Sequence, residues 1–411
     1  MSTTTDDLRR RMTSALQDGE LLRLSPGLET AVVIAVGAEE FSLVFRDGGA
    51  FLEAEKSGEL RLSASEEAWA LTLSPPPPPR YHAFTAFQLA NDEFSFAGDP
   101  KLWAQARSAL ERLFELVVAC PPHAAPAVQR DLSQISGRYE TIHVEGIAYD
   151  VFCEEAGQGI PVLFLHTAGA DGRQYLGQLA DLELAKRFRL IAVDMPFHGR
   201  SLPPRTWQGN PYKLTTELYR SWCSAILDKV VGEPAIVVGG SMGAAIAMVL
   251  AADCADKVRG IVAVEPPYRS KGRRNPYQNH VEVNGGLHNS SFVRGLMSPT
   301  SPEADRRRAS WIYAQAAPGI YNGDLSFYSD EFDGELVAPR IDSARTPVAL
   351  LSGTYDYSAT PEDGARLAKL IPGSLFVTMD GLGHFPMCEH PDLFRGYLLQ
   401  ALDFILKADR H

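Results

Sequence analysis

A serine stands among closely spaced glycines at residues 239–243, in the order Gly-Gly-Ser-Met-Gly. The continuous apolar run 235–238 precedes this segment and the alanine-rich run 244–248 follows it, so a buried strand, a sharp turn and a helix are expected in succession. Such a turn lifts the Ser241 hydroxyl into the open and aims the next backbone N–H and the helix N-terminus at the same point. Side chains at the flanking glycines would collide with the strand or the helix. The pattern predicts that Ser241 is a nucleophile; the alternative is a structural turn serine.

His384 is the histidine best placed to activate that serine. A hydroxyl is a poor nucleophile unless a base removes its proton, and ten histidines compete for the role. His384 follows the last expected strand, within residues 380–386, where glycine and proline indicate a loop at the carboxyl edge of the sheet. Ser241 should emerge at the same edge. Other histidines are interpreted as a helix cap (His390), as structural residues (His82, His123 and His143) or as candidate substrate contacts (His280 and His288).

Asp356 is the residue expected to orient the imidazole and to stabilise its cationic form. It follows the penultimate expected strand, which gives the chain order Ser241, Asp356, His384. Glu265, at the end of the strand after the serine turn, is the main rival for this role. The oxyanion of a tetrahedral intermediate also needs preorganised donors, and the Met242 backbone N–H is expected to be one of them.

Short apolar runs without polar alternation recur in the C-terminal two thirds of the chain, with helical segments between them. Such runs are typical of strands buried on both faces, and their alternation with helices predicts a parallel, doubly wound sheet in an α/β fold. Ligands of such sheets bind beyond the carboxyl ends of the strands, which is where the residues considered above are expected. The expected strands are residues 161–165, 189–193, 235–238, 260–264, 347–351 and 374–377.

Two further loops carry a resemblance to a known family. Residues 166–169 (His-Thr-Ala-Gly) stand where the α/β-hydrolase family has His-Gly-x-Gly, and residues 194–201 (Asp-Met-Pro-Phe-His-Gly-Arg-Ser) resemble its Asp-x-Pro-Gly-His-Gly-x-Ser turn. With the serine turn, these loops make residues 140–408 resemble that family. The resemblance implies an α/β-hydrolase fold with a doubly wound, mostly parallel sheet and a lid insertion at about residues 266–345.

The same resemblance implies roles within these two loops. Ala168 is expected to supply the second oxyanion N–H, whereas His166 and His198 are expected to be scaffold residues. Thr167 and Phe197 depart from the family pattern, because each replaces a glycine. The β-branched side chain of Thr167 can alter the first loop, so the role of Ala168 depends on it.

The expected lid is rich in aromatic residues, which favours a small or medium-sized hydrophobic substrate. The alternative is that most of these rings pack the lid onto the body of the protein. The aromatic residues are Tyr268, Tyr277, Trp311, Tyr313, Tyr321, Phe327 and Tyr328. The residues predicted to contact substrate are Thr167, Tyr268, His288, Trp311 and Tyr313.

The first part of the chain has a different pattern. Residues 1–120 are interpreted as a smaller α+β domain, residues 121–135 as a linker that begins with a proline-rich stretch, and residues 136–411 as the catalytic domain. Within the smaller domain, strands are expected at 29–34, 41–45 and 60–63, and helices near 6–16 and 100–118.

A second resemblance concerns this smaller domain. The turn at 45–49, the segment 63–69 and the stretch 94–99 make residues 5–120 resemble the sterol carrier protein type 2 family. That resemblance implies an apolar tunnel for lipid-like ligands. The alternative is a packing or dimerisation module with an ordinary core, through which the chain could form a homo-oligomer.

The composition narrows the classes of function. The chain has 411 residues and a net charge of −12, which argues against nucleic-acid binding because that needs a concentrated basic surface. Two short basic clusters, at 269–274 and 306–308, are interpreted as solvated faces, with an anion-attracting site as the alternative. No membrane span and no secretory signal is expected. Five scattered cysteines without C-x-x-C spacing favour a reducing, cytoplasmic setting.

Together, these features predict a serine hydrolase that cleaves a carboxylic ester or lactone of a hydrophobic compound. The sequence contains no phosphate-binding loop and no zinc-binding cysteine pattern, and the expected mechanism requires neither a metal nor an organic cofactor. Two alternatives stay open. One is a carbon–carbon bond hydrolase acting on a β-diketone or ring-fission product. The other is a lipid-binding protein with a degenerate hydrolase body.

Overall fold

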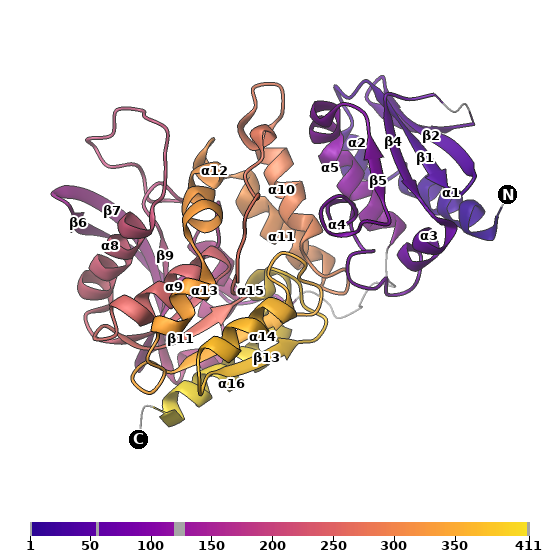
Figure 1. Ribbon diagram of the computed structural model, residues 1–411. Helices are drawn as coiled ribbons and strands as arrows, with labels where there is room; N and C mark the ends of the chain where they lie inside the picture. The colour runs from indigo at the N-terminus through magenta and orange to yellow at the C-terminus, as the bar shows by residue number, and fades with distance from the viewer. Residues whose placement is uncertain (1, 55–56, 119–127, 409–411) are drawn as a thin grey trace.

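The computed structural model describes residues 2–54, 57–118 and 128–408, which fold around a larger and a smaller β-sheet (Figure 1). Residues after 128 form the larger sheet and its helices. Residues 2–118, called the N-terminal segment below, form the smaller one. Cys120, His123 and the proline-rich part of the expected linker lie outside the described residues. Within the described ranges, no helix is both long and apolar enough to cross a membrane.

The larger sheet has eight strands in the order β13-β12-β11-β10-β8-β9-β7-β6. The strands from β13 to β9 run parallel to their neighbours, and β7 and β6 join antiparallel at one edge. All six expected strands are present, and the additional β6–β7 hairpin has alternating burial instead of a continuous apolar run. The bounds are β6 Ser136–Val144, β7 Ile147–Ala156, β8 Ile160–Leu165, β9 Phe188–Asp194, β10 Ala235–Gly240, β11 Val258–Val264, β12 Val348–Gly353 and β13 Leu375–Met379.

Helices cover both faces of this sheet and bury the alternate side chains of its strands. Helices α8, α9 and α14 pack on one face, and α6 and α16 pack on the other. Helix α9 begins directly after Ser241 and is buried along nearly its whole length, because α8 covers the side that faces away from the sheet. The bounds are α6 Leu176–Leu179, α7 Leu182–Ala185, α8 Thr216–Ile226, α9 Met242–Asp253, α14 Pro361–Leu370, α15 Pro386–Glu389 and α16 Pro391–Ala408.

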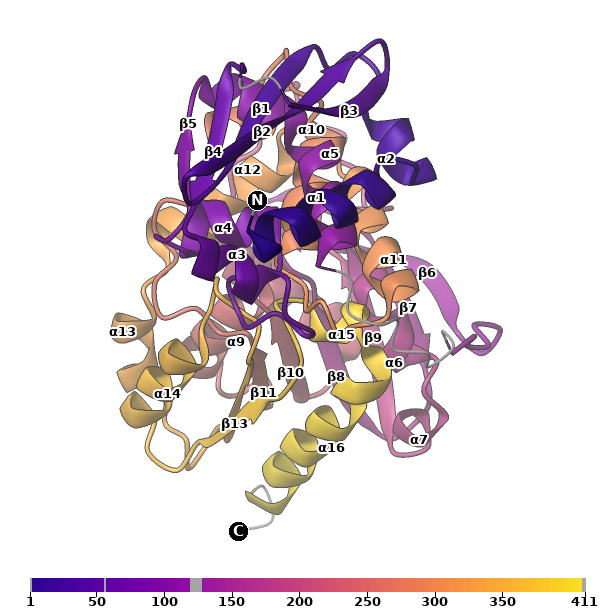
Figure 2. The same cartoon turned by 90° about the vertical axis from the view of Figure 1, so that its right-hand side faces the viewer.

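Residues 265–347, between β11 and β12, form a helical insertion at the position in the sequence expected for a lid. Its helices α10 and α11 lie next to the N-terminal segment in Figure 1, and Figure 2 shows that segment above the larger sheet. The bounds are α10 Gly285–Gly295, α11 Glu303–Ala314, α12 Ile320–Leu325, the π-helical turn η4 Ser326–Glu331 and α13 Gly334–Val337.

The N-terminal segment has a five-stranded sheet in the order β3-β2-β1-β4-β5, in which only the β1–β4 pair is parallel among the described residues. Its interior is filled by aromatic rings in mutual contact, namely Trp69, Phe84, Phe87, Phe94 and Phe114. The bounds are α1 Thr3–Ala15, α2 Gly19–Leu24, β1 Thr30–Val36, β2 Glu39–Arg46, β3 Gly49–Glu53, β4 Leu60–Ala64, α3 Glu66–Thr72, α4 Phe84–Ala90, β5 Ser95–Ala97 and α5 Pro100–Val117.

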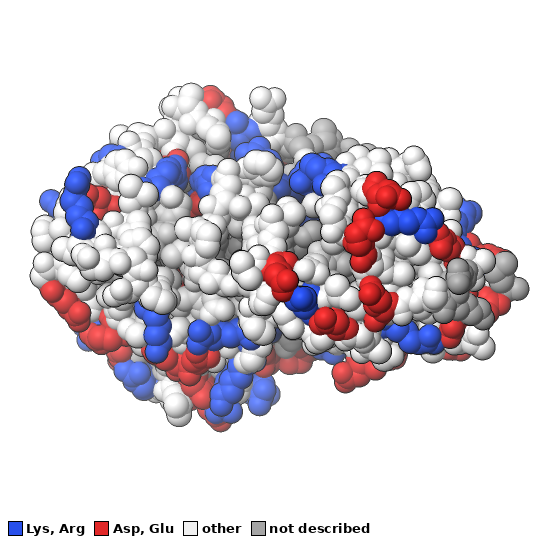
Figure 3. All heavy atoms as spheres, turned by 90° about the horizontal axis from the view of Figure 1, so that it is seen from above, with Lys and Arg blue, Asp and Glu red and all other residues white. Residues whose placement is uncertain are grey.

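Charged side chains of both signs are interspersed on the face of the molecule seen in Figure 3, without a concentrated basic area there. The basic clusters noted in the sequence are largely ion-paired. In the first, Arg269 pairs with Asp333, and Arg274 pairs with Asp330 at 2.8 Å. In the second, Arg306 and Arg307 pair with carboxylates of the N-terminal segment and of α11.

Candidate active site

Ser241 lies in a sharp turn between β10 and α9, with φ 52° and ψ −108°, in the left-handed half of conformational space that side chains rarely adopt. A Cβ at Gly239 would collide with the Gly243 carbonyl, and a Cβ at Gly243 would collide with the Leu165 carbonyl. Glycine is therefore required on both sides of the serine for the strand and helix to approach so closely. The turn presents the serine hydroxyl at the carboxyl edge of the sheet.

The three side chains expected to act together lie within hydrogen-bonding distance of one another. His384 Nε2 is 2.9 Å from Ser241 Oγ, and His384 Nδ1 is 2.6 Å from Asp356 Oδ2. All three residues are buried, at 4% or less of full exposure. A serine, an imidazole and a carboxylate in this arrangement can move a proton from the hydroxyl to the ring during attack on a carbonyl carbon.

Asp356 is held as a carboxylate by the groups around it. Its Oδ1 atom accepts hydrogen bonds from the backbone N–H groups of Ser358 (2.6 Å) and Ala359 (3.1 Å). Burial alone would raise the pKa of Asp356, but the adjacent His384 and these hydrogen bonds hold it below its ordinary value. The acid is therefore ionised at neutral pH and can stabilise an imidazolium.

Glu265, the rival acid, is fully buried beside Asp356 and does not contact the imidazole in place of it. Both its carboxyl oxygens accept from the Gly353 backbone N–H, at 2.9 and 3.0 Å. Burial, together with the negative charge of Asp356, raises the pKa of Glu265 well above its ordinary value. This shift favours the protonated form of Glu265, which can donate a hydrogen bond to the Asp356 carboxylate.

The loop expected to complete the oxyanion site leaves one backbone donor available. The Thr167 N–H donates to Gln174 Oε1 at 3.0 Å, and the Gly169 N–H donates to Asp324 Oδ2 at 2.7 Å. Within the described part of the chain, neither Ala168 nor Met242, at the first position of α9, uses its N–H in a hydrogen bond. The structure thus leaves Ala168 and Met242 as donors for a ligand.

Thr167, one of the two departures from the family pattern, is integrated into a polar cluster. Its hydroxyl donates to Gln174 Oε1 at 3.1 Å and is also hydrogen-bonded to the Tyr313 hydroxyl, which comes from α11. The second departure, Phe197, adopts φ 74°, the left-handed conformation that a glycine would normally supply. Its ring packs against Tyr212 and Trp207, and these contacts offset the strain.

Asp324, which the sequence analysis did not single out, links the insertion to both loops that resemble the family pattern, through Gly169 and His198. Its Oδ2 atom accepts from His198 Nε2 at 2.9 Å as well as from Gly169, and its Oδ1 atom accepts from the Tyr212 hydroxyl at 2.9 Å. Burial disfavours the charged form of His198, but the Asp324 charge outweighs it and raises the pKa of His198. His166 Nε2 accepts from the Met195 N–H at 3.2 Å. The contacts of both histidines are thus internal to the scaffold.

The other residues predicted to contact substrate lie in different surroundings. Tyr268 packs under the Arg366 guanidinium, whose carbon is 4.2 Å from the ring centroid. His288 is buried and contacts Asn289, and its pKa is lowered to about 4 by burial and by Arg107. Trp311 is 63% exposed and lines an outer groove that also includes Leu132, Ile312 and Met387.

Tyr328 is a residue near the serine that the sequence analysis did not select. Its hydroxyl lies close to the hydroxyls of Ser241 and Ser270, and it completes no hydrogen bond with another described residue. The side chain is only 3% exposed and lies on the π-helical turn η4. Such turns are frequent at functional sites, but a single π-turn has no signature in the sequence.

Comparisons with known proteins identify the family to which the larger part of the chain is similar. Residues 160–391 match the family described as "alpha/beta hydrolase fold". The chain is 35% identical over 265 residues to the AB hydrolase superfamily protein YisY of Bacillus subtilis, which covers 61% of this chain and 94% of that protein. It is 25% identical over 270 residues to the pimeloyl-(acyl-carrier protein) methyl ester esterase of Chromobacterium violaceum, over 62% and 98% of the two chains. Among solved structures, the enol-lactonase from Burkholderia xenovorans LB400 superimposes with a TM-score of 0.55 at 22% identity, over 65% of this chain and 100% of that one.

Proposed function

Because this chain belongs to the α/β-hydrolase fold family, we propose that it is a serine hydrolase that cleaves a carboxylic ester or lactone of a medium-sized hydrophobic compound. The observation that carries the proposal is the continuous contact from Ser241 through His384 to Asp356, at 2.9 and 2.6 Å. Relatives named as an esterase and an enol-lactonase favour the same class of reaction. Because a fold of this kind hosts many reactions, the residues around the serine carry the argument for the chemistry.

In the acylation step, Ser241 Oγ attacks the carbonyl carbon while His384 Nε2 accepts the hydroxyl proton. Asp356, ionised and hydrogen-bonded to Nδ1, stabilises the imidazolium. The Met242 and Ala168 N–H groups hold the oxyanion of the tetrahedral intermediate. When the intermediate collapses, the carbon–oxygen bond to the leaving group breaks and His384 returns its proton to the departing oxygen.

In the deacylation step, a water molecule gives its proton to His384 and attacks the acyl-enzyme. The second tetrahedral intermediate uses the same two donors and collapses to release the carboxylic acid and the free Ser241 hydroxyl. For a lactone, both products are parts of one hydroxy acid. Every proton in the cycle passes through His384, so no further acid or base is needed.

We assign the helical insertion the role of a lid over this site. Ser241 is only 4% exposed, and the insertion supplies Tyr313 and Tyr328 near the serine turn. Aromatic side chains with a polar tip can pack against an apolar acyl group and still orient its carbonyl. These contacts support a hydrophobic substrate, with Thr167 and Tyr313 at the reacting end.

The test is hydrolysis by Ser241→Ala of a panel of p-nitrophenyl esters, lactones and β-diketones. We expect the wild-type protein to turn over esters or lactones and Ser241→Ala to lose that activity. The matched control is Ser42→Ala, which replaces another buried serine, hydrogen-bonded to the Ser57 carbonyl in the N-terminal segment. Unchanged turnover in Ser241→Ala would refute the proposal.

The same panel separates the alternatives. Turnover of β-diketones without turnover of esters would favour a carbon–carbon bond hydrolase. Failure of a fluorophosphonate probe to label Ser241 in the folded wild-type protein would favour a binding protein. Labelling that disappears in Ser241→Ala and persists in Ser42→Ala would support the serine mechanism directly.

A further inference from the structure

The N-terminal segment contacts the loop that carries Asp356 and the end of α10, which in turn contacts the loop that carries His384. We infer that it is a positioning element of the active site, which fixes the acid loop directly through His82 and the base loop through the end of α10. This inference rests on the proposed function, because it gives these loops a catalytic role. In this role the N-terminal segment contributes to the reaction without binding a ligand itself.

The acid loop is the first point of contact. Asp356 lies between Tyr355 and Tyr357, and the ring of His82 packs against both tyrosines, with centroids 5.2 and 5.9 Å away. The Tyr355 hydroxyl also donates a buried hydrogen bond to the Pro77 carbonyl at 2.9 Å. The residues on either side of the proposed acid are therefore packed against the N-terminal segment.

His82 makes this contact as a neutral aromatic ring. It is 3% exposed, and burial, with a smaller effect of Arg306, lowers its pKa to about 3. Neither ring nitrogen has a hydrogen-bond partner among the described residues, although the ring lies near the backbone of Gly295. A buried ring without polar partners contributes through its shape, so a phenyl ring of similar size should replace it.

The end of α10 is the second point of contact. The Gly295 carbonyl accepts a hydrogen bond from the Tyr357 hydroxyl at 2.9 Å, and the Leu296 carbonyl accepts one from the His384 backbone N–H at 3.0 Å. Two adjacent carbonyls of the insertion thus hold the acid loop and the base loop at once. A displacement of this end of α10 would move both loops.

Gly295 shows how closely α10 approaches the N-terminal segment at this point. A Cβ at Gly295 would lie 2.6 Å from Thr85 Cβ and 2.8 Å from Glu111 Oε2. Thr85 donates to the Glu111 carboxyl through both its N–H (2.9 Å) and its hydroxyl (2.6 Å), so this contact surface is itself fixed. The glycine allows the backbone of α10 to rest directly on that pair.

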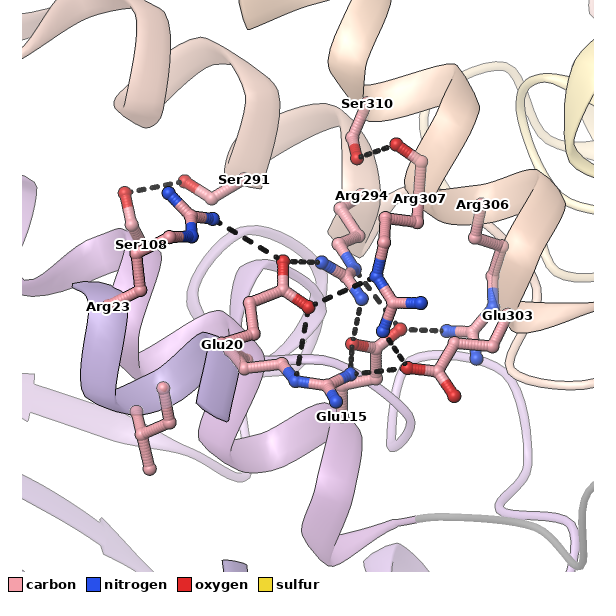
Figure 4. A network of polar contacts seen from close by, with 12 residues as sticks. Glu20, Arg23, Ser108, Glu115, Ser291, Arg294, Glu303, Arg306, Arg307 and Ser310 are labelled. Carbon is pink, nitrogen blue, oxygen red and sulfur yellow. Dashed lines mark hydrogen bonds and ion pairs between the residues drawn. The ribbon is translucent and has the colours of Figure 1, made fainter. Parts of the chain in front are cut away.

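A buried ion network also ties the same end of α10 to α2 and α5 of the N-terminal segment (Figure 4). Arg294, next to Gly295, pairs with Glu20 at 2.7 Å and with Glu115 at 2.6 Å. Glu115 also pairs with Arg112 and Arg306, and these three guanidinium groups lower its pKa to about 2 although burial opposes them. Moving α10 would leave some of these buried charges without a partner, which is energetically costly. The network therefore resists movement of α10.

The consequence for the reaction concerns turnover more than binding. Misplacement of catalytic groups by about 1 Å can lower rates by about 100-fold, whereas substrate affinity depends on the walls of the site. Loosening the acid loop should therefore reduce kcat and leave KM nearly unchanged. The ion network therefore opposes a swing of the α10–α11 end of the insertion.

The experiment compares full-length variants with the ester or lactone turned over by the wild type. We expect His82→Ala to lower kcat at least ~10-fold with KM changed less than ~3-fold, and His82→Phe to restore kcat to within ~2-fold. Tyr357→Phe keeps the ring contact with His82 and removes only the hydrogen bond to the Gly295 carbonyl. It should therefore lower kcat by ~3-fold or more without loss of folding. Thermal unfolding of each variant is measured in parallel.

The matched control is Lys101→Ala, which removes an exposed ion pair with Glu282 between the same two parts of the chain, at 2.9 Å. It should leave kcat unchanged. Wild-type kcat in both His82→Ala and Tyr357→Phe would overturn the inference, as would an equal loss in His82→Phe and His82→Ala. Ser241→Ala is assayed in the same series. If it keeps its activity, the proposed function fails. If it is inactive while His82→Ala and Tyr357→Phe both keep wild-type kcat, only the positioning role fails.

Discussion

Replacing Glu389 with glutamine should remove a pH-dependent part of the stability of the protein. Glu389 is fully buried on α15, where its carboxyl accepts from the Gly383 N–H at 2.6 Å and from the Ser301 hydroxyl at 3.1 Å. It also accepts a longer hydrogen bond, of 3.4 Å, from the Phe385 N–H. Glu389 is therefore bonded to the residues directly before and after His384. Despite these hydrogen bonds, burial raises the pKa of Glu389 to about 7.

The sign and size of the effect follow from linkage. The unfolded chain releases the Glu389 proton near pH 4.5 and the folded chain releases it only near pH 7. Between these values the unfolded state binds fewer protons, so stability present below pH 4.5 is lost as the pH rises through 7. At about 1.4 kcal/mol for each pH unit, the wild type should lose about 2 to 3 kcal/mol between pH 5 and pH 8 through this residue.

The assay is guanidinium unfolding followed by tryptophan fluorescence at pH 5 and pH 8. Glu389→Gln should reduce the difference in unfolding free energy between the two pH values by about 2 to 3 kcal/mol. A residual difference should remain, because burial also raises the pKa of Glu111 to about 7. The control is Glu67→Gln, at an exposed position of α3, which should change nothing. The reasoning is refuted if Glu389→Gln and the wild type have the same pH dependence.

Two further substitutions test the acid pair. Asp356→Asn should lower kcat by about 10⁴-fold without loss of folding, because the asparagine amide can leave the wrong nitrogen of His384 protonated. Steady-state kinetics on the ester substrate would measure this loss. A kcat within about 10-fold of the wild-type value would contradict the expectation. Glu265→Gln should keep kcat within ~3-fold at neutral pH, because the raised pKa favours the protonated carboxyl and a glutamine N–H can replace its O–H as donor to Asp356. Glu265→Ala, which leaves no donor, should lose at least ~10-fold. Equal activities of the Gln and Ala variants would contradict this account.

The features that could be predicted from the sequence are those with a local signal. Burial on both faces requires continuous apolar runs, and these runs identified six strands of the larger sheet. The close approach of β10 and α9 requires Gly239 and Gly243, which marked the position of Ser241. Because the carboxyl ends of parallel strands meet at one edge, chain order alone placed Asp356 and His384 near the serine.

The features that could not be predicted depend on residues far apart in the sequence. Asp324 reaches Gly169 across 155 positions, and nothing in its own neighbourhood indicates that partner. The sequence offered two acids after neighbouring strands, and only the three-dimensional arrangement shows that Asp356 meets the imidazole while Glu265 lies behind it. The sequence predicts His288 as a substrate contact from its position in the insertion, but gives no sign that burial and Arg107 of the N-terminal segment lower its pKa.

The ion network around Glu115 has a consequence for synthesis of the chain. Arg294 follows Glu115 by 179 positions, so at 5–20 residues per second the ribosome makes it about 10 to 35 s later. During that interval the N-terminal segment can collapse on its own aromatic interior while Glu20 and Glu115 still lack a partner from the insertion. The nascent segment therefore carries an acidic, solvent-facing surface that is covered only when α10 and α11 have left the ribosome. Docking of these helices onto the N-terminal segment should therefore follow the collapse of that segment, and slowing translation between the two regions should leave an intermediate that is sensitive to protease at this surface.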